Sequence, residues 1–296
     1  MTDQKPVPQD VIDIYHDYTH GAYDRRTFMS RLALSVGGIA AAEAMLPLLT
    51  NNYALAQTVA ENDPRLVTEA FSYKNGSEDV SGTLVRLTGA AKRPAVIIIH
   101  ENRGLNPHIK DVARRYALEG FLAFAVDILS PEGGTPANED TARDMIGKLD
   151  GDLATARIAA AIPVLTAHPE STGSIGAVGY CWGGGQVNAL AVTVPDLKAG
   201  VAYYGRQQPA DKVATIKAAL LLHYAEKDDR VNEGIAAYKD ALTSAGKTFE
   251  IHTYPGTQHA FNNDTNAARY NAEAAKLAYE RSLVFLRNHV GETPKA

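Results

Sequence analysis

An alternation of short apolar runs with longer helical stretches is the feature that most restricts the fold of this 296-residue chain. Residues 95–100 form a continuous, β-branched apolar run, which is typical of a strand covered on both faces. From about residue 66, such runs alternate with stretches of helical period. This order predicts an α/β fold with a mostly parallel, doubly wound sheet. We expect an antiparallel hairpin over residues 71–87, turning at Asn75-Gly76, to precede it.

The other expected elements follow from the same reading. Strands are expected over residues 121–126, 174–180, 200–204, 218–224 and 248–254, and helices over 107–119, 139–166, 183–192, 232–245 and 266–290. In sheets of this class, ligand sites form beyond the carboxyl ends of the strands. We therefore expect the chemistry to follow His100, Asp127, Tyr180, Tyr224 and Tyr254.

Charge and cysteine content exclude several classes of function. Lys and Arg number 29 and Asp and Glu 34, which gives a net charge of −5 without any long basic block. A nucleic-acid or anionic-membrane surface is therefore not expected. Cys181 is the single cysteine, so the chain can form neither an internal disulfide nor a metal site built from several cysteines.

The pentapeptide Gly179-Tyr180-Cys181-Trp182-Gly183 lies between a predicted strand and a glycine-rich helix start. A nucleophile elbow has this spacing, because side chains at the flanking positions would collide with neighbouring backbone. The start of a helix also favours a reactive thiolate over a thiol. Although a lone cysteine is more often a small buried apolar residue, this setting predicts that Cys181 is a nucleophile.

An elbow nucleophile needs an acid and a histidine, which follow it in the chain in that order. Asp228 and Asp229 follow one predicted strand, and His259 follows the next. We predict that His259 is the base and Asp228 its acid, since Val231 begins the next helix and Asp229 suits a helix start. Structural or surface roles are expected for the histidines at 223, 252 and 289.

The first 60 residues allow two interpretations. Arg25-Arg26, the Ala- and Leu-rich run over residues 32–49 and the pattern Ala54-Leu55-Ala56 resemble a signal read by the twin-arginine translocation machinery, which would export the protein to the periplasm. Acidic residues before the arginines and Glu43 within the run argue against it. The alternative is a cytoplasmic protein with a retained N-terminal helical arm that packs on the body or on a second subunit in a homodimer. In either case residues 61–296 form the main domain.

His16 and His20 are four residues apart, a spacing that places two imidazoles on one helix face, as in some metal sites. No glutamate in the H-E-x-x-H position lies between them. We therefore expect a polar helix face here, and neither a metal nor another cofactor in this protein.

Over roughly residues 66–290, the chain resembles the dienelactone hydrolase (carboxymethylenebutenolidase) family of α/β-hydrolases. The residues that carry the resemblance are the cysteine elbow with Gly184 after it, the acid turn at Asp228, Pro255-Gly256 before the histidine, and His100-Glu101 after the first central strand. The resemblance implies an α/β-hydrolase fold and a hydrolase of small esters or lactones.

The resemblance also implies roles for individual residues. The implied catalytic triad is Cys181, His259 and Asp228. Glu101 would contact the resting thiol and help to deprotonate it when substrate binds. The backbone N–H groups of Asn102 and Trp182 would form the oxyanion hole, in agreement with the rule that the residue after an elbow nucleophile donates.

The chain departs from the family at the expected substrate site. Members that act on dienelactone hold its carboxylate with two arginines, but the matching stretches, residues 128–132 and 260–263, contain none. Arg103 or Arg206 would have to supply positive charge from another direction, unless both are surface residues. The sequence thus predicts thioester chemistry on Cys181 with an unassigned natural substrate. The alternatives are a thioesterase or promiscuous arylesterase on the same site, and a non-catalytic relative that binds a small ligand or a partner protein.

Overall fold

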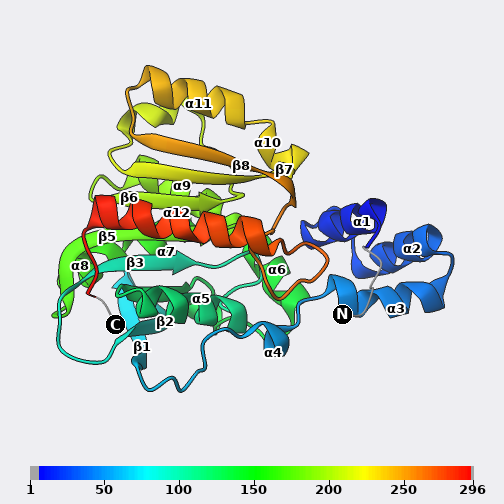
Figure 1. The fold of residues 1–296 in the computed structure, drawn as a ribbon, viewed down its shortest axis with the longest axis horizontal. Coiled ribbons are helices and arrows are strands. Elements are labelled where there is room, and N and C mark those ends of the chain that lie inside the picture. The colour runs from blue at the N-terminus through cyan, green and yellow to red at the C-terminus, as the bar shows by residue number, and fades with distance from the viewer. Residues whose placement is uncertain (1–6, 295–296) are drawn as a thin grey trace.

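The computed structural model describes residues 7–294, so residues 1–6 of the predicted N-terminal segment lie outside the described residues (Figure 1). Eight strands form one sheet in the order β1-β2-β4-β3-β5-β6-β7-β8. The β1–β2 and β2–β4 pairs are antiparallel, and the other pairs are parallel. This arrangement confirms the predicted α/β-hydrolase fold class. The strands are β1 (Leu66–Asn75), β2 (Glu78–Leu87), β3 (Arg93–Ile99), β4 (Leu122–Asp127), β5 (Ser171–Tyr180), β6 (Ala199–Tyr203), β7 (Ala219–Lys227) and β8 (Phe249–Gln258).

Helices cover both faces of the sheet and extend beyond one end of it. They are α1 (Gln9–Thr19), α2 (Arg25–Val36), α3 (Ile39–Leu49), α4 (Tyr53–Ala56), α5 (Pro107–Leu118), α6 (Glu139–Lys148), α7 (Gly151–Ala159), α8 (Ala161–Thr166), α9 (Trp182–Thr193), α10 (Asp229–Asn232), α11 (Ile235–Ser244) and α12 (Ala272–Val290), with short 3-10 helices η1 (Ser130–Glu132) and η2 (Ala210–Thr215). Helices α5 and α12 pack on one face, while α6 to α9 and α11 pack on the other.

The central strand β3 shows why residues 95–99 are apolar without interruption. Ile97 and Ile99 point into the core on one face, and Val96 and Ile98 point into the core on the other. Every residue of β3 is buried. A strand covered on both faces has no polar side, as its sequence predicts.

The long helical stretch expected over residues 139–166 is present, divided into three helices. Leu149 is extended, with ψ of 132°, and the Asp150 side chain accepts a hydrogen bond from the Leu153 backbone N–H to start α7. Pro163 then prevents α7 from continuing, because it has no N–H to donate to the preceding turn. Helix α12 likewise begins six residues later than expected, where Asn271 caps it.

Helices α1 to α3 lie together at one end of the molecule, beyond the carboxyl ends of the strands (Figure 1). They share an apolar core of their own, formed by Val11, Tyr15, Tyr18, Phe28, Leu32, Ala42 and Leu49. Among the described residues no single helix is long and apolar enough to cross a membrane. Helices α2 and α3 reach that length only as a pair bent by 107°. Residues 8–59, which include these helices, are called the arm below.

Candidate active site

The predicted elbow is present between β5 and α9. Cys181 has φ of 54°, a backbone conformation that a residue with a side chain rarely adopts and that is typical of strained elbow nucleophiles. A Cβ atom on Gly179 would lie 2.1 Å from the Gly183 carbonyl oxygen, and one on Gly183 would lie 2.4 Å from the Ile99 carbonyl oxygen. Both elbow positions therefore need glycine for lack of space, as the sequence predicts.

The acid and the histidine come from neighbouring strands. Asp228 follows β7 and His259 follows β8, and His259 Nδ1 lies 2.5 Å from Asp228 Oδ2. Both residues are buried: His259 is 3% exposed and Asp228 is 4% exposed. Since a carboxylate oxygen accepts, the imidazole donates its Nδ1–H, which leaves a lone pair on Nε2. That Nε2 is buried and has no hydrogen-bond partner among the described residues.

Burial sets the charge of this pair. Loss of solvent lowers the pKa of His259 well below its ordinary value and raises the pKa of Asp228 to about 6. Near neutral pH, a neutral imidazole thus lies against a carboxylate that is mostly ionised. Such an imidazole can take a proton at Nε2 while the carboxylate stabilises the cation that forms.

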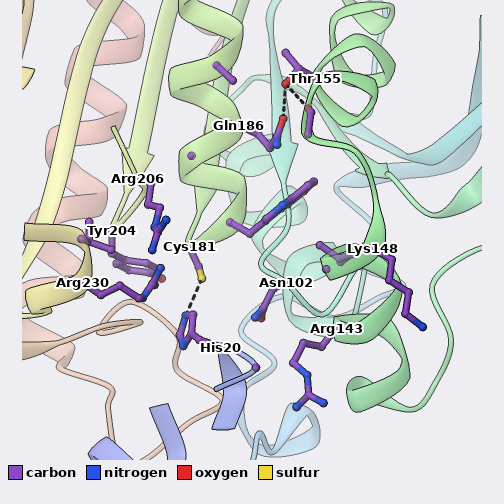
Figure 2. A pocket seen from close by; sticks show the side chains of 18 of the residues that line it. His20, Asn102, Arg143, Lys148, Thr155, Cys181, Gln186, Tyr204, Arg206 and Arg230 are labelled. Atoms are coloured by element: carbon purple, nitrogen blue, oxygen red, sulfur yellow. Dashed lines mark hydrogen bonds between the residues drawn. The ribbon is translucent and has the colours of Figure 1, made fainter. Parts of the chain in front are cut away.

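The thiol of Cys181 is half-buried, and a histidine of the arm lies closest to it. His20 Nε2 is 3.6 Å from Cys181 Sγ, within hydrogen-bonding distance for sulfur (Figure 2). Burial, followed by the negative charge of Glu101, raises the pKa of Cys181 to about 12, although the Trp182 backbone N–H acts in the opposite sense. The side chain therefore rests as a thiol near neutral pH, and the helix start alone does not make it a thiolate.

Glu101 is buried next to the elbow, but its carboxylate is engaged elsewhere. Its Oε2 atom accepts a hydrogen bond of 2.8 Å from Asn263 Nδ2, and in the described part of the chain the thiol's hydrogen bond goes to His20. Asn102 and Trp182 both line the cavity beside Cys181, where the expected oxyanion hole would be. The Asn102 side chain is fixed, because its Nδ2 donates to the Thr19 carbonyl oxygen at 2.8 Å.

A cavity of about 630 Å³ opens beside Cys181 (Figure 2). Its walls come from the end of α1, from α6 and α7, from the elbow helix α9, from the loop after β6 and from α10. Arg206 and Arg230 lie on one side of the cavity, and within the described residues neither forms an ion pair. Arg143 lies on the opposite side and is neutralised by the carboxylates of Asp140 and Asp144, at 3.2 and 2.8 Å.

The two arginines that the sequence suggested as substrate ligands have different surroundings. Arg206 lines the cavity, as expected. Arg103 does not line it, because its buried guanidinium pairs with Glu139 and donates to the Tyr15 hydroxyl at 3.0 Å. Arg103 therefore holds the arm rather than facing the cavity. Arg230 lines the cavity in the role that was expected of Arg103, and sequence reasoning missed it. Its sequence signal is its position two residues after Asp228.

His16 and His20 lie on a polar helix face, and the structure adds that both rings face the candidate active site. Their centroids lie 5.1 and 4.8 Å from that of His259. Ligand atoms of His20, Cys181 and His259 all lie within 4.8 Å of one another. Two imidazole nitrogens and one sulfur suit a borderline-soft ion such as Zn²⁺. These are the described residues that are best placed to hold such an ion.

A mixed eight-stranded sheet with a strained nucleophile elbow, an acid after β7 and a histidine after β8 defines the chain as an α/β-hydrolase. Residues 80–290 match the model of the dienelactone hydrolase family, and the chain belongs to this family. The predicted resemblance is thus confirmed, and the protein is a dienelactone hydrolase-like hydrolase. The family match begins at residue 80 and does not reach the arm.

Individual relatives agree with this assignment. A Bradyrhizobium protein named as a probable 2-oxo-3-(5-oxofuran-2-ylidene)propanoate lactonase is 30% identical over 221 residues, which cover 70% of this chain and 88% of the relative. A Saccharolobus solfataricus protein provisionally named carboxymethylenebutenolidase is 34% identical over 229 residues, covering 65% of this chain and 88% of its own. The crystal structure of a provisionally named dienelactone hydrolase from Klebsiella pneumoniae is 27% identical, with a TM-score of 0.68, and the match covers 76% of this chain and 99% of that one.

Proposed function

We propose that the protein hydrolyses small esters or lactones through a thioester on Cys181, with His259 and Asp228 as its proton-transfer pair. The observation that carries this proposal is the buried Asp228–His259 hydrogen bond, which leaves His259 Nε2 free next to a strained cysteine elbow. The sulfur attacks the carbonyl carbon, the thiol proton ends on the departing alkoxide, and the alcohol leaves. Water then gives a proton to His259 and attacks the thioester, which releases the acid and restores the thiol.

Backbone donors complete the proposed site. The N–H groups of Trp182 and Asn102 would stabilise the negative oxygen of the tetrahedral intermediate. Because a thiolate is also a good leaving group, activated esters and strained lactones suit the site better than amides do. Thioesters and aryl esters remain the rival substrates, and kcat/KM values over a panel of lactones, thioesters and aryl esters would rank the three classes.

The two cavity arginines support a substrate that carries a carboxylate. Arg206, from the loop after β6, and Arg230, from α10, replace the positive charge that is absent from residues 128–132 and 260–263. An arginine without a partner near an apolar cavity favours a carboxylate ligand, which it can bind with two hydrogen bonds. The Bradyrhizobium relative is named for a lactone that bears a propanoate group. We therefore propose anionic lactones or esters as the substrate class.

Replacing Arg206 with glutamine should weaken the binding of anionic substrates selectively. Loss of one charge-assisted interaction of about 1.5–3 kcal/mol corresponds to a roughly 10- to 100-fold higher KM for an anionic ester. The p-nitrophenyl monoester of succinate, compared with neutral p-nitrophenyl acetate, measures this effect. The same substitution at the exposed Arg26 is the control and should change neither substrate's KM. An unchanged ratio of the two KM values in Arg206→Gln would contradict the proposed substrate class.

We also propose that the arm stays with the mature protein, because it is bound to the body at several places. The Tyr18 hydroxyl donates to Asp140 at 2.5 Å, the Asn52 backbone N–H donates to the Thr265 carbonyl at 2.8 Å, and Arg25 of the predicted export signal pairs with Asp140 at 3.4 Å. The intact mass of the protein from fractionated cells should therefore include the residues before Gln57. A periplasmic protein whose mass begins at Gln57 would instead establish a cleaved twin-arginine signal.

A further inference from the structure

His20 contacts the proposed nucleophile, but the reaction proposed above gives it no role. It directly follows α1, 161 positions before the nucleophile, yet its Nε2 atom lies 3.6 Å from Cys181 Sγ (Figure 2). It also lines the cavity beside Cys181. A ring that touches both the reacting sulfur and the substrate cavity is in a position to exchange protons with either of them.

The hydrogen bonds of His20 fix its tautomer. Its Nδ1 atom lies 2.8 Å from the His16 carbonyl oxygen, which can only accept a hydrogen bond, so Nδ1 carries the proton. Nε2 then holds a lone pair and accepts the Cys181 S–H. Burial lowers the pKa of His20 well below its ordinary value, which agrees with a neutral resting ring. The thiol and the imidazole thus form a neutral donor–acceptor pair.

The other possible acceptors of the thiol proton are less well placed at rest. Glu101 is held by Asn263, and His259 forms no hydrogen bond to the thiol in the described structure, its Nε2 being without a partner. His20 and His259 are therefore two neutral imidazoles, each with an unprotonated Nε2 and each oriented through its own Nδ1–H. One of them is bonded to the sulfur, and the other is left for a second reactant such as water.

We propose that His20 is a second catalytic imidazole, which serves acylation, while His259 serves deacylation; this assignment rests on the thioester mechanism proposed above. The S–H proton moves to His20 Nε2 as the C–S bond forms, and the departing alkoxide takes that proton as the C–O bond breaks. In deacylation His259 takes a proton from the attacking water and returns it to the departing sulfur. Each half-reaction thus ends with both imidazoles neutral. Cys181 is a thioester after acylation and a thiol again after deacylation.

The arm holds His20 firmly enough for this role. The Thr19 carbonyl oxygen, next to His20, accepts from Asn102 Nδ2 at 2.8 Å. On the same helix Tyr18 bonds to Asp140 and Tyr15 accepts from Arg103 at 3.0 Å. The carbonyl that orients the ring belongs to His16 of the same helix turn. Three contacts with the body thus position the end of α1 at the catalytic centre.

Pre-steady-state kinetics with p-nitrophenyl acetate separate the two half-reactions, because release of nitrophenolate reports acylation alone. His20→Gln retains a polar side chain that cannot carry the proton, so the burst rate should fall by about 10²- to 10⁴-fold, while deacylation of a preformed acyl-enzyme changes little. His259→Gln should show the reverse pattern, with the burst retained and turnover lost. The exposed His289→Gln is the matched control and should behave as the parent. Added imidazole, which can enter the cavity, should restore part of the burst rate in His20→Ala.

The outcomes distinguish this inference from the mechanism on which it rests. A parental or faster burst in His20→Gln would overturn the role of His20; a faster burst would mean that the arm obstructs the site. A burst that persists in Cys181→Ala would instead overturn the thioester mechanism itself. ¹⁵N NMR of the unmodified full-length protein gives an answer that needs no variant to fold: a His20 ring protonated at Nδ1 supports the assignment, and one protonated at Nε2 contradicts it.

Discussion

A Cys181→Ala variant is expected to lose kcat/KM for p-nitrophenyl acetate by about 10⁴-fold or more, because no other described side chain occupies the elbow from which attack occurs. The variant should fold, since alanine is smaller than cysteine and carries the same Cβ through the strained turn. Hydrolysis by parent and variant is followed at equal protein concentration, and thermal melting checks that both are folded.

The same variant decides between an enzyme and a binding protein. A non-catalytic relative would show equally low rates in parent and variant. A variant that hydrolyses the ester as fast as the parent would remove Cys181 from the mechanism and would direct attention to another nucleophile.

An Asp228→Asn variant should lose about 10²- to 10⁴-fold in kcat, because an amide no longer stabilises the imidazolium and can turn its N–H₂ group toward His259 Nδ1, which favours the wrong tautomer. Asp229→Asn is the matched control. Asp229 is the exposed neighbour that begins α10, so its loss should leave kcat close to that of the parent. Equal effects of the two substitutions would contradict the assignment of Asp228.

The pH dependence follows from the same carboxyl group. Burial raises the pKa of Asp228 to about 6, so the ionised, active form predominates above that pH and is lost as the pH falls through it. The parent's kcat should therefore decrease about tenfold per pH unit on the acid side, because kcat includes the deacylation step that His259 and Asp228 serve. Because asparagine does not titrate, the limb near pH 6 should be absent in Asp228→Asn. Profiles measured between about pH 4 and 8 test this, and a limb that stays in the variant would assign it to another group.

The positions of Cys181, Asp228 and His259 in the fold could be predicted because each is tied to local sequence. The elbow at Cys181 needs glycines on both sides, and Asp228 and His259 each end a strand whose apolar run is visible in the chain. Parallel strands bring their carboxyl ends to one edge, so chain order alone was enough to bring the acid and the histidine together. The apolar pattern of β3 likewise followed from burial on both faces.

The contribution of the arm could not be predicted, because it depends on packing between distant segments. The four-residue spacing of His16 and His20 shows that they share a helix face, but not that this face meets His259. Arg103 looked like a substrate ligand because it follows a central strand, whereas Glu139 and Tyr15 surround it in the folded chain. Charge partners contributed by another element leave no mark in the local sequence.

The most direct test of the account is to look for the acyl-enzyme. His259→Gln incubated briefly with p-nitrophenyl acetate should accumulate an acetyl group on the peptide that contains Cys181, as seen by mass spectrometry of the digested protein. Hydroxylamine should remove it, because a thioester reacts readily with this nucleophile. The account predicts near-stoichiometric acetylation at Cys181 and none in Cys181→Ala. Nitrophenolate release without any acyl group on Cys181 would contradict it.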